Sequence, residues 1–318
     1  MKRLFTVLLI LLLLLPLSGC KGGCYESGSG ELSIVTTVFP AFDFAREIAG
    51  DMASVCLLIP PGSESHSFEP TAQDILRIQN CDLLICNGGE SEVWLEDMLE
   101  GMEGDIPTVV MMDCVPTLEE EVKEGMQAAE HEHGEAEAHD HEMEYDEHVW
   151  TSPRNAALIS QAISDRLCAI DPDNALYYSS RCNRYCDSLL SLDDDFRTLF
   201  QQAGHPTMIF ADRFPVRYFV EEYGLDYYAA FPGCAEQAEP SARTVAFLID
   251  MVRQEHTPAV FYIEFSNHKM ADVICEDTGC KKLLFHSCHN VTRQQLDEGI
   301  SYLKLMQGNL ETLMEAFG

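Results

Sequence analysis

Two blocks of alternating strand-like and helix-like segments constrain the fold of this chain more than any other feature. In the first block, runs of apolar and β-branched residues predict strands over 32–39, 53–59, 83–86 and 107–112. Helical segments separate these runs, over 41–49, 71–80 and 92–99. Because strands that alternate with helices pair in parallel, with the helices on the faces of the sheet, this block predicts an α/β lobe.

The same alternation resumes after Gly204, with strands predicted over 207–211, 225–230, 259–264 and 282–286 and helices over 214–223, 241–255, 267–278 and 296–317. Residues 171–203 connect the two blocks, and their apolar residues recur at steps of three and four, as in a helix. About 30 helical residues would span roughly 45 Å. We therefore predict an α/β fold in which two lobes with parallel β-sheets flanked by helices, 32–170 and 204–318, are joined by one long backbone helix.

An acidic, His-rich segment over 119–147 interrupts the first lobe and is predicted to be a solvated loop. The chain has 20 Lys and Arg against 53 Asp and Glu, a formal net charge of −33. This balance argues against binding to nucleic acid or to an anionic membrane surface. An acidic surface attracts cations instead. The loop could therefore scavenge metal loosely, although it could also be solvated without a role; its candidate ligands are His131, His133, His139 and His141.

The N-terminus has the pattern of an export signal. Lys2 and Arg3 precede a leucine-rich run over 4–17, which is too short for a stable membrane-spanning helix. The run ends in Leu17-Ser18-Gly19-Cys20, which resembles the lipobox of bacterial lipoproteins. We expect a signal peptide over 1–19, acylation of Cys20 and a flexible tether over 20–31, with an ordinary secretory peptide as the alternative. Two acyl chains would hold the protein, on the extracytoplasmic side, at the bacterial cell membrane.

Of the 13 cysteines, 12 remain once Cys20 is set aside, and none of them forms a Cys-x-x-Cys pair. A structural zinc site built from cysteines needs such closely spaced pairs and is not expected. Export would permit disulfides, but the spacing does not fix their pairing. Cys182 and Cys186, one helical turn apart, are poorly placed to bridge.

Histidines follow strands in both lobes. His66 lies in the Pro/Gly-bounded loop after the second strand, His148 lies at the end of the acidic loop, and His286 follows the last strand. Ligands bind outside the carboxyl ends of the strands of an open α/β sheet, so these histidines are expected to converge on the cleft between the lobes. Three imidazoles and one oxygen would suit tetrahedral Zn²⁺. Asp146 or Glu147 could orient the His148 ring.

These residues resemble the cluster A-I solute-binding lipoproteins of ABC importers for zinc and manganese, over about residues 32–315. Two segments carry the resemblance: Gly-x-x-x-His-x-x-Glu-Pro at 62–70 and His-Val-Trp-x-Ser-Pro at 148–153. The acidic His-rich insert resembles that of the zinc-specific branch. The resemblance implies that His66 and His148 are metal ligands from the first lobe. It also implies a long connecting helix and lobes that move little on metal capture.

The resemblance implies two further ligands from the second lobe. The family has a His or Glu after the first strand of that lobe, and counting back from Gly224 places Arg213 there. A guanidinium cannot ligate a metal, so we expect Asp212 to replace it. The family's last ligand is an Asp after the final strand, where His286 matches. The predicted metal site is His66, His148, His286 and Asp212; the reserves are Glu264, His268 and His289, of which His289 is interpreted first as a structural, hydrogen-bonded histidine.

The resulting hypothesis is a lipid-anchored receptor that captures Zn²⁺ between its lobes and delivers it to an ABC permease and its ATPase. We expect a monomer. Three imidazoles favour zinc, whereas participation of Glu264 and Asp212 would favour manganese or iron. An exported zinc hydrolase is the alternative from another class, but it would need a general base, and no HExxH motif is present. An adhesin role is neither supported nor excluded by the sequence.

Overall fold

The computed structural model of the chain describes residues 25–63, 68–102, 104–127, 144–235 and 240–318. The predictions for Cys20, for His66 and for the four loop histidines fall outside these ranges. None of the described helices is both long and apolar enough to cross a membrane.

The N-terminal lobe is built on a sheet with strand order β1-β3-β2-β4-β5. Its parallel strands are β2 (Leu32–Thr36), β3 (Ala53–Leu57), β4 (Leu83–Cys86) and β5 (Thr108–Val110). The edge strand β1 (Tyr25–Ser27) pairs antiparallel with β3. This strand lies inside the interval 20–31, where a flexible tether was expected, and that prediction is wrong for these three residues because their backbone pairs with an otherwise open sheet edge.

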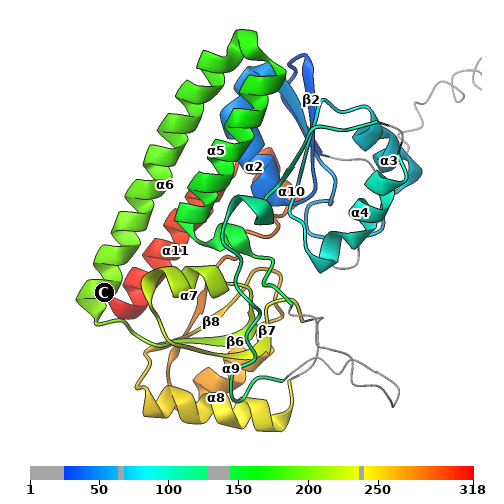
Figure 1. The fold of residues 1–318 in the computed structure, drawn as a ribbon. Coiled ribbons are helices and arrows are strands. Elements are labelled where there is room, and N and C mark those ends of the chain that lie inside the picture. The colour runs from blue at the N-terminus through cyan, green and yellow to red at the C-terminus, as the bar shows by residue number, and fades with distance from the viewer. Residues whose placement is uncertain (1–24, 64–67, 103, 128–143, 236–239) are drawn as a thin grey trace, which may run out of the picture.

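Helices cover both faces of this sheet (Figure 1). Successive strand residues point to opposite faces, so Ile34 packs in the core shared with α2 and α5, whereas Val35 packs with residues of α3 and α4. The helices are α2 (Phe39–Ala49), α3 (Ala72–Gln79), α4 (Val93–Glu100) and α5 (Pro153–Ile170). α2 begins two residues earlier than predicted, with Pro40 in its first turn, where a missing N–H breaks no helical hydrogen bond.

The C-terminal lobe has a four-stranded parallel sheet of order β7-β6-β8-β9. Its strands are β6 (Met208–Phe214), β7 (Tyr227–Pro232), β8 (Ala259–Tyr262) and β9 (Lys281–Leu284), and its first helices are α7 (Arg217–Tyr223), α8 (Ala242–Gln254) and α9 (Lys269–Thr278). Helices α8 and α9 pack on one face of the sheet, through Leu248 and Ile274. The opposite face joins the large core that also contains α6.

The last predicted helix, over 296–317, is instead two helices. α10 (Arg293–Asp297) begins at a capping box formed by Thr292 and Gln295, and α11 (Tyr302–Phe317) begins at the cap Ser301. Between them Gly299 has φ +74°, a left-handed conformation that ends α10. The backbone N–H of Tyr302 then donates to the buried Asp43 carboxylate of α2, 2.7 Å away, which ties the end of the chain to the N-terminal lobe.

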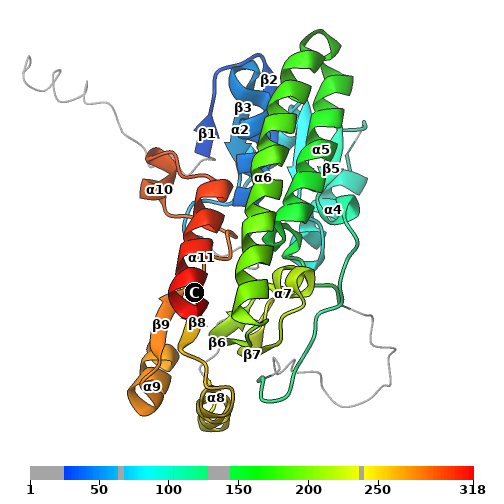
Figure 2. The same cartoon turned by 90° about the vertical axis from the view of Figure 1, so that its left-hand side faces the viewer.

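The predicted connecting helix is α6 (Ala175–Ala203), preceded by a short 3₁₀ turn at Pro172–Asn174. Its 29 residues span about 43 Å. It packs along α5 and α2 and continues past α7 and α11 of the other lobe, as Figures 1 and 2 show. Two lobes with flanked, mainly parallel sheets and one long backbone helix confirm the predicted fold class. Further 3₁₀ turns lie at Gly50–Met52, Glu90–Glu92, Met112–Cys114 and Val149–Thr151.

Cys56 is disulfide-bonded, and the other described cysteines are free thiols. The Sγ atoms of Cys182 and Cys186, on successive turns of α6, are 3.7 Å apart. The Sγ atoms of Cys275 and Cys280 are 3.4 Å apart, between α9 and β9.

Candidate metal-binding site

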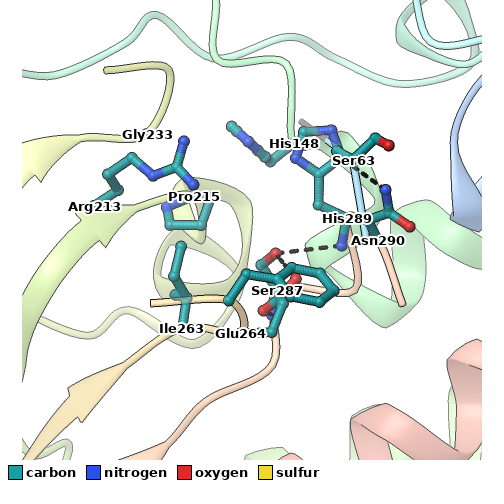
Figure 3. Close-up of a pocket in the computed structure, with 11 residues that line it drawn as sticks. Ser63, His148, Arg213, Pro215, Gly233, Ile263, Glu264, Ser287, His289 and Asn290 are labelled. Carbon is teal, nitrogen blue, oxygen red and sulfur yellow. Dashed lines mark hydrogen bonds between the residues drawn. The ribbon is translucent and has the colours of Figure 1, made fainter. Parts of the chain in front are cut away.

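A small pocket lies where loops from both lobes meet, outside the carboxyl ends of the strands (Figure 3). Its volume is about 40 Å³. The N-terminal lobe contributes Ser63 and His148. The side chains from the C-terminal lobe that matter for its chemistry are Arg213, Glu264, Ser287, His289 and Asn290.

His148 is the most firmly placed histidine of the pocket. It is 1% exposed, its backbone N–H donates to Asp146 Oδ1 at 2.8 Å, and its ring Nδ1 lies 3.1 Å from the same oxygen. A carboxylate accepts, so Nδ1 carries the proton and Nε2 keeps the lone pair that a metal needs. Burial lowers the pKa of His148, but the charge and hydrogen bond of Asp146 and the charge of Glu147 outweigh it, and the pKa is raised. Of the two predicted orienting carboxylates, Asp146 takes the role.

The neighbouring Glu147 fixes this segment to the N-terminal lobe. Its carboxylate accepts from the backbone N–H of Ser91 at 2.8 Å and from the Ser91 hydroxyl at 2.5 Å, while its carbonyl accepts from Asn87 Nδ2 at 3.0 Å. Gly89 has φ +87°, and a Cβ there would lie 2.6 Å from the Glu147 carboxylate. A side chain at position 89 would therefore displace the segment that carries His148.

The same segment is also held by the C-terminal lobe. The Tyr218 hydroxyl of α7 donates to the Asp146 carbonyl at 2.8 Å and accepts from the Leu118 N–H at 3.0 Å. Both described ends of the acidic insert pass this point, and Glu119 and Tyr145 form a β-bridge between them. Farther along, Glu120 Oε1 accepts from the N–H of Cys234. The insert thus leaves and re-enters the fold beside the pocket.

His289 faces His148 from the other lobe. The ring centroids are 5.4 Å apart with an interplanar angle of 83°, and the His289 ring also lies 5.3 Å from that of Trp150. The loop carrying His289 is fixed on two sides. Trp150 Nε1 donates to the Ser287 carbonyl at 2.9 Å, and the N–H and hydroxyl of Ser287 donate to the Glu264 carboxylate at 2.7 and 2.5 Å.

His286 does not line this pocket, although it was predicted as the ligand, and its ring Nδ1 lies 3.5 Å from Glu264 Oε2. Its backbone N–H and C=O both bond the Asn309 side chain, at 2.7 and 2.8 Å, and its Nδ1 accepts from the Cys288 N–H at 3.0 Å. Cys288 has φ +62°, a rare conformation for a residue with a side chain. The chain turns there, so that His286 packs inward while His289 lines the pocket.

Asp212, the predicted fourth ligand, also lies outside the pocket lining. Its Oδ1 accepts from the Arg213 N–H at 2.8 Å and its Oδ2 from the Ile263 N–H at 3.3 Å. Burial raises the pKa of this carboxyl, partly offset by its hydrogen bonds. With the reserve His268 it lines a neighbouring cavity of about 370 Å³. His268 itself is exposed and lies 3.4 Å from the Asp272 carboxylate.

Arg213, which the count back from Gly224 placed at the family's ligand position, lines the pocket. Figure 3 shows its guanidinium directed into the pocket, toward His148. Nη1 donates to the Ala235 carbonyl at 3.4 Å. The reserve Glu264 lines the pocket as well, from the end of β8, and its carboxylate is already bonded to Ser287. The structure therefore brings His148, His289, Glu264 and Arg213 together.

Sequence reasoning missed two residues that shape the pocket. Gly233 lies so close that a Cβ would be 2.9 Å from the Phe214 carbonyl and 3.3 Å from His148 Cε1. Asn290 closes the floor, because its side chain bonds the backbone of Pro60, Gly62 and Ser63 at 2.7–3.3 Å. A glycine three residues after the end of the predicted strand 225–230 was the available signal for the first. The second depends on a partner more than 200 residues away and had none.

Within the described ranges, no group of three or more His, Cys, Asp or Glu side chains is close enough to hold a metal ion. The described part of the pocket offers two imidazoles and one carboxylate. His66 belongs to the loop whose described end, Gly62 and Ser63, Asn290 holds at the pocket. Imidazole nitrogens and a carboxylate oxygen are the donors that Zn²⁺ takes in proteins.

Comparison with known proteins places this chain in a family. The zinc-binding lipoprotein AdcA of Streptococcus pneumoniae (strain R6) is 30% identical over 319 residues, which cover 99% of this chain and 61% of AdcA. The zinc uptake protein ZnuA of Bacillus subtilis is 30% identical over 300 residues, 94% of this chain and 91% of that protein. The chain thus spans about three fifths of the length of AdcA.

Solved structures agree with this comparison. The Zn(II)-bound ZnuA-like domain of S. pneumoniae AdcA has a TM-score of 0.73 and 26% identity, covering 91% of this chain and 99% of that domain. Residues 34–316 match the family described as ZnuA, zinc-uptake complex component A, periplasmic. With two lobes, a backbone helix and a match over nearly its whole folded length, the chain belongs to the ZnuA family of zinc-uptake components.

Proposed function

We propose that this protein captures Zn²⁺ in the pocket between its lobes and delivers it to an ABC permease and its ATPase. One observation carries the proposal: His148 and His289, from different lobes, face each other across a small pocket. The Nδ1 atom of His148 is hydrogen-bonded to Asp146, which leaves Nε2 for a metal. The names of the relatives, a zinc-binding lipoprotein and a zinc uptake protein, support the choice of metal.

The proposed protein ligands are His66, His148 and His289. We no longer propose His286 and Asp212, because neither lines the pocket: the His286 ring is buried and accepts from the Cys288 N–H, and Asp212 lines a neighbouring cavity. Glu264 lines the pocket, but both of its oxygens accept hydrogen bonds from Ser287, so we give it the role of fixing the loop that carries His289. Three imidazoles favour Zn²⁺ over Mn²⁺, which prefers oxygen ligands.

Delivery and anchoring are also proposals. The relatives are named as a lipoprotein and as part of a zinc uptake system, which supports acylation of Cys20, an extracytoplasmic location and a permease partner for this chain. We propose that the protein acts as a monomer, because each lobe already contributes to the pocket. We propose that the loop histidines 131, 133, 139 and 141 bind zinc loosely.

A zinc hydrolase would need an open coordination position and a general base beside it. The carboxylate that lines the pocket, Glu264, is engaged by the N–H and hydroxyl of Ser287 rather than left to accept a proton from water. The relatives carry names of binding and uptake proteins. We therefore propose a receptor rather than an enzyme.

The test is the metal content and metal affinity of the chain from residue 21 onward, which omits the expected signal peptide and the acylation site Cys20. The protein is purified without added metal, and bound metal is measured by mass spectrometry. Zn²⁺ and Mn²⁺ affinities are then compared by competition with a chromophoric chelator. We expect one tight equivalent of zinc, with Mn²⁺ bound at least 100-fold more weakly. Tighter binding of Mn²⁺, or no tight equivalent of any metal, would contradict the proposal.

A further inference from the structure

The end of helix α9 brings two thiols together. Cys275 lies in the last turn of the helix, and Cys280 is the residue before β9. Their Sγ atoms are 3.4 Å apart, and both side chains are half-buried. Helix α9 and strand β9 pack against each other at one edge of the C-terminal lobe (Figure 2). A small reagent in solvent can therefore reach the pair.

The helix cap explains why the two sulfurs meet. Gly279 has φ +77°, a left-handed conformation that ends α9, and its N–H donates to the Cys275 carbonyl at 2.9 Å. Helix ends of this kind often carry a contact between the residue after the glycine and one in the last turn. The Lys281 N–H then donates to the Pro258 carbonyl at 2.9 Å and fixes the start of β9. The backbone is thus held on both sides of Cys280.

We propose that Cys275 and Cys280 form an intramolecular disulfide when the protein meets a disulfide donor of the glutathione type. One thiolate attacks a sulfur of the donor and forms a mixed disulfide, and the other thiolate then attacks that bond. The two cysteine thiols are oxidised, the donor disulfide is reduced to two thiols, and the two protons pass to the donor sulfurs. The extracytoplasmic location proposed above would expose the pair to oxidising conditions.

The bridge would tie the end of α9 to β9, an edge strand that within the described sheet pairs with β8 alone. Burial and the neighbouring Cys280 thiol raise the pKa of Cys275. A thiol of high pKa is a poor leaving group, so the bridge should be reduced slowly once formed. It lies at the amino end of β9, whereas the metal pocket lies beyond the carboxyl ends of the strands, so this inference does not depend on zinc binding.

A second thiol pair serves as an internal control. The Sγ atoms of Cys182 and Cys186 are 3.7 Å apart, but both residues lie on one helix and Cys182 is 0% exposed. Their thiols donate to the carbonyls of Ser160 and Ala157 in α5, each at 3.5 Å. Because a donor has no access to Cys182, this pair should stay reduced although its sulfurs are nearly as close.

The experiment uses the chain from residue 21 onward, reduced with dithiothreitol, freed of the reductant and kept in EDTA. Equimolar oxidised and reduced glutathione is added, the remaining thiols are alkylated in denaturant, and tryptic peptides are analysed by mass spectrometry. Cys275 and Cys280 share the tryptic peptide 270–281, whereas Cys182 and Cys186 fall in two different peptides.

We expect more than half of the 270–281 peptide to carry no alkyl group and to be lighter by two hydrogen atoms than its reduced form. Cys182 and Cys186 should both be alkylated. Alkylation of Cys275 and Cys280 throughout the sample would overturn the proposal.

Single variants test the second step of the exchange. Cys275→Ser and Cys280→Ser each leave one thiol without its partner, so glutathione bound to that thiol should accumulate at least about tenfold above the wild type. Cys182→Ser, the matched control, should leave the bridged fraction of the 270–281 peptide unchanged. If the wild type accumulates as much mixed disulfide as the single variants, the two thiols do not react with each other and the proposal is wrong.

Discussion

The His148 and His289 rings meet edge to face, 5.4 Å apart, although 141 positions separate them in the chain. One comes from the segment before α5 and the other from the loop after β9, so the pocket exists only when the two lobes are joined. This contact gives the first prediction.

His289→Ala should weaken zinc binding by at least 100-fold, because it removes a proposed ligand. His286→Ala should change the affinity only a few-fold, because that ring accepts from the Cys288 N–H inside the fold. It should instead lower the free energy of unfolding by about 1–3 kcal/mol, through an unpaired N–H and a small cavity. Chelator competition and urea unfolding measure the two effects. The reverse order of affinities would restore His286 as the ligand.

Asp146→Asn should lower the zinc affinity by about 10–100-fold, because the carboxylate orients the ring and fixes the proton on Nδ1. The carboxylate also raises the pKa of His148. A histidine must be deprotonated to bind a metal. As the pH is lowered, the zinc affinity of the wild type should therefore begin to fall at a pH above the ordinary histidine pKa. In Asp146→Asn the midpoint of this fall in affinity should move to lower pH. Asp165→Asn, an exposed carboxylate of α5, is the matched control. An unchanged pH profile in Asp146→Asn would refute the orienting role.

Zinc binding should change the fluorescence of Trp150, because its ring lies 5.5 Å from His148 and 5.3 Å from His289. The chain has two tryptophans. The other one, Trp94 of α4, packs against Phe68. Trp94→Phe should therefore keep the zinc-dependent signal and Trp150→Phe should lose it. A titration followed by emission gives the answer, and a signal that survives in Trp150→Phe would place the metal elsewhere.

Glu92 should make metal-free protein less stable as the pH rises. Its carboxylate accepts from the N–H groups of Asn87 and Gly88, but burial raises its pKa to about 7, above the ordinary 4.5. A group whose pKa is higher in the folded state than in the unfolded state contributes its full stabilisation at pH values below its unfolded-state pKa. That contribution is lost between about pH 4.5 and 7, amounting to about 3 kcal/mol at most.

Urea unfolding with EDTA at pH 5 and pH 7.5 measures this loss, and Glu92→Gln should show a smaller difference between the two pH values. The buried Asp43, whose pKa burial raises to about 6, changes in the same window but is common to both proteins. Equal pH dependence in the two would show that Glu92 is ionised throughout.

Deletion of 128–143 should lower only the number of zinc ions bound, and the tight site should keep its affinity. The deletion spares the described ends of the insert, which bond Tyr218 and Cys234 beside the pocket. Metal content by mass spectrometry and chelator competition would be compared with the full chain. A loss of the tight equivalent would mean that the loop supplies a ligand.

Local sequence signals were enough for the fold class and for part of the site, although they missed β1 and the break between α10 and α11. Periodicity located the strands and α6, and the segment at 148–153 placed His148 at the pocket. The choice between His286 and His289 could not be made in this way, because both follow the same strand. It depends on the left-handed turn at Cys288 and on Asn309, which bonds both sides of the His286 backbone from α11. Asp212 failed for a related reason: its neighbours Arg213 and Ile263 determine where its carboxylate lies.

Helix α6 has a consequence for how zinc would leave the protein. Because one uninterrupted helix packs against elements of both lobes, we expect the binding-competent arrangement to be the resting one, so that capture loses no affinity to a rare closed state. On this expectation, release would not rely on the lobes swinging apart. It would have to come from a local change, and the segment best placed for one is Ser287–Asn290. Its hydrogen bonds with Trp150 and Ser63 join the two lobes, and a docked permease could break them.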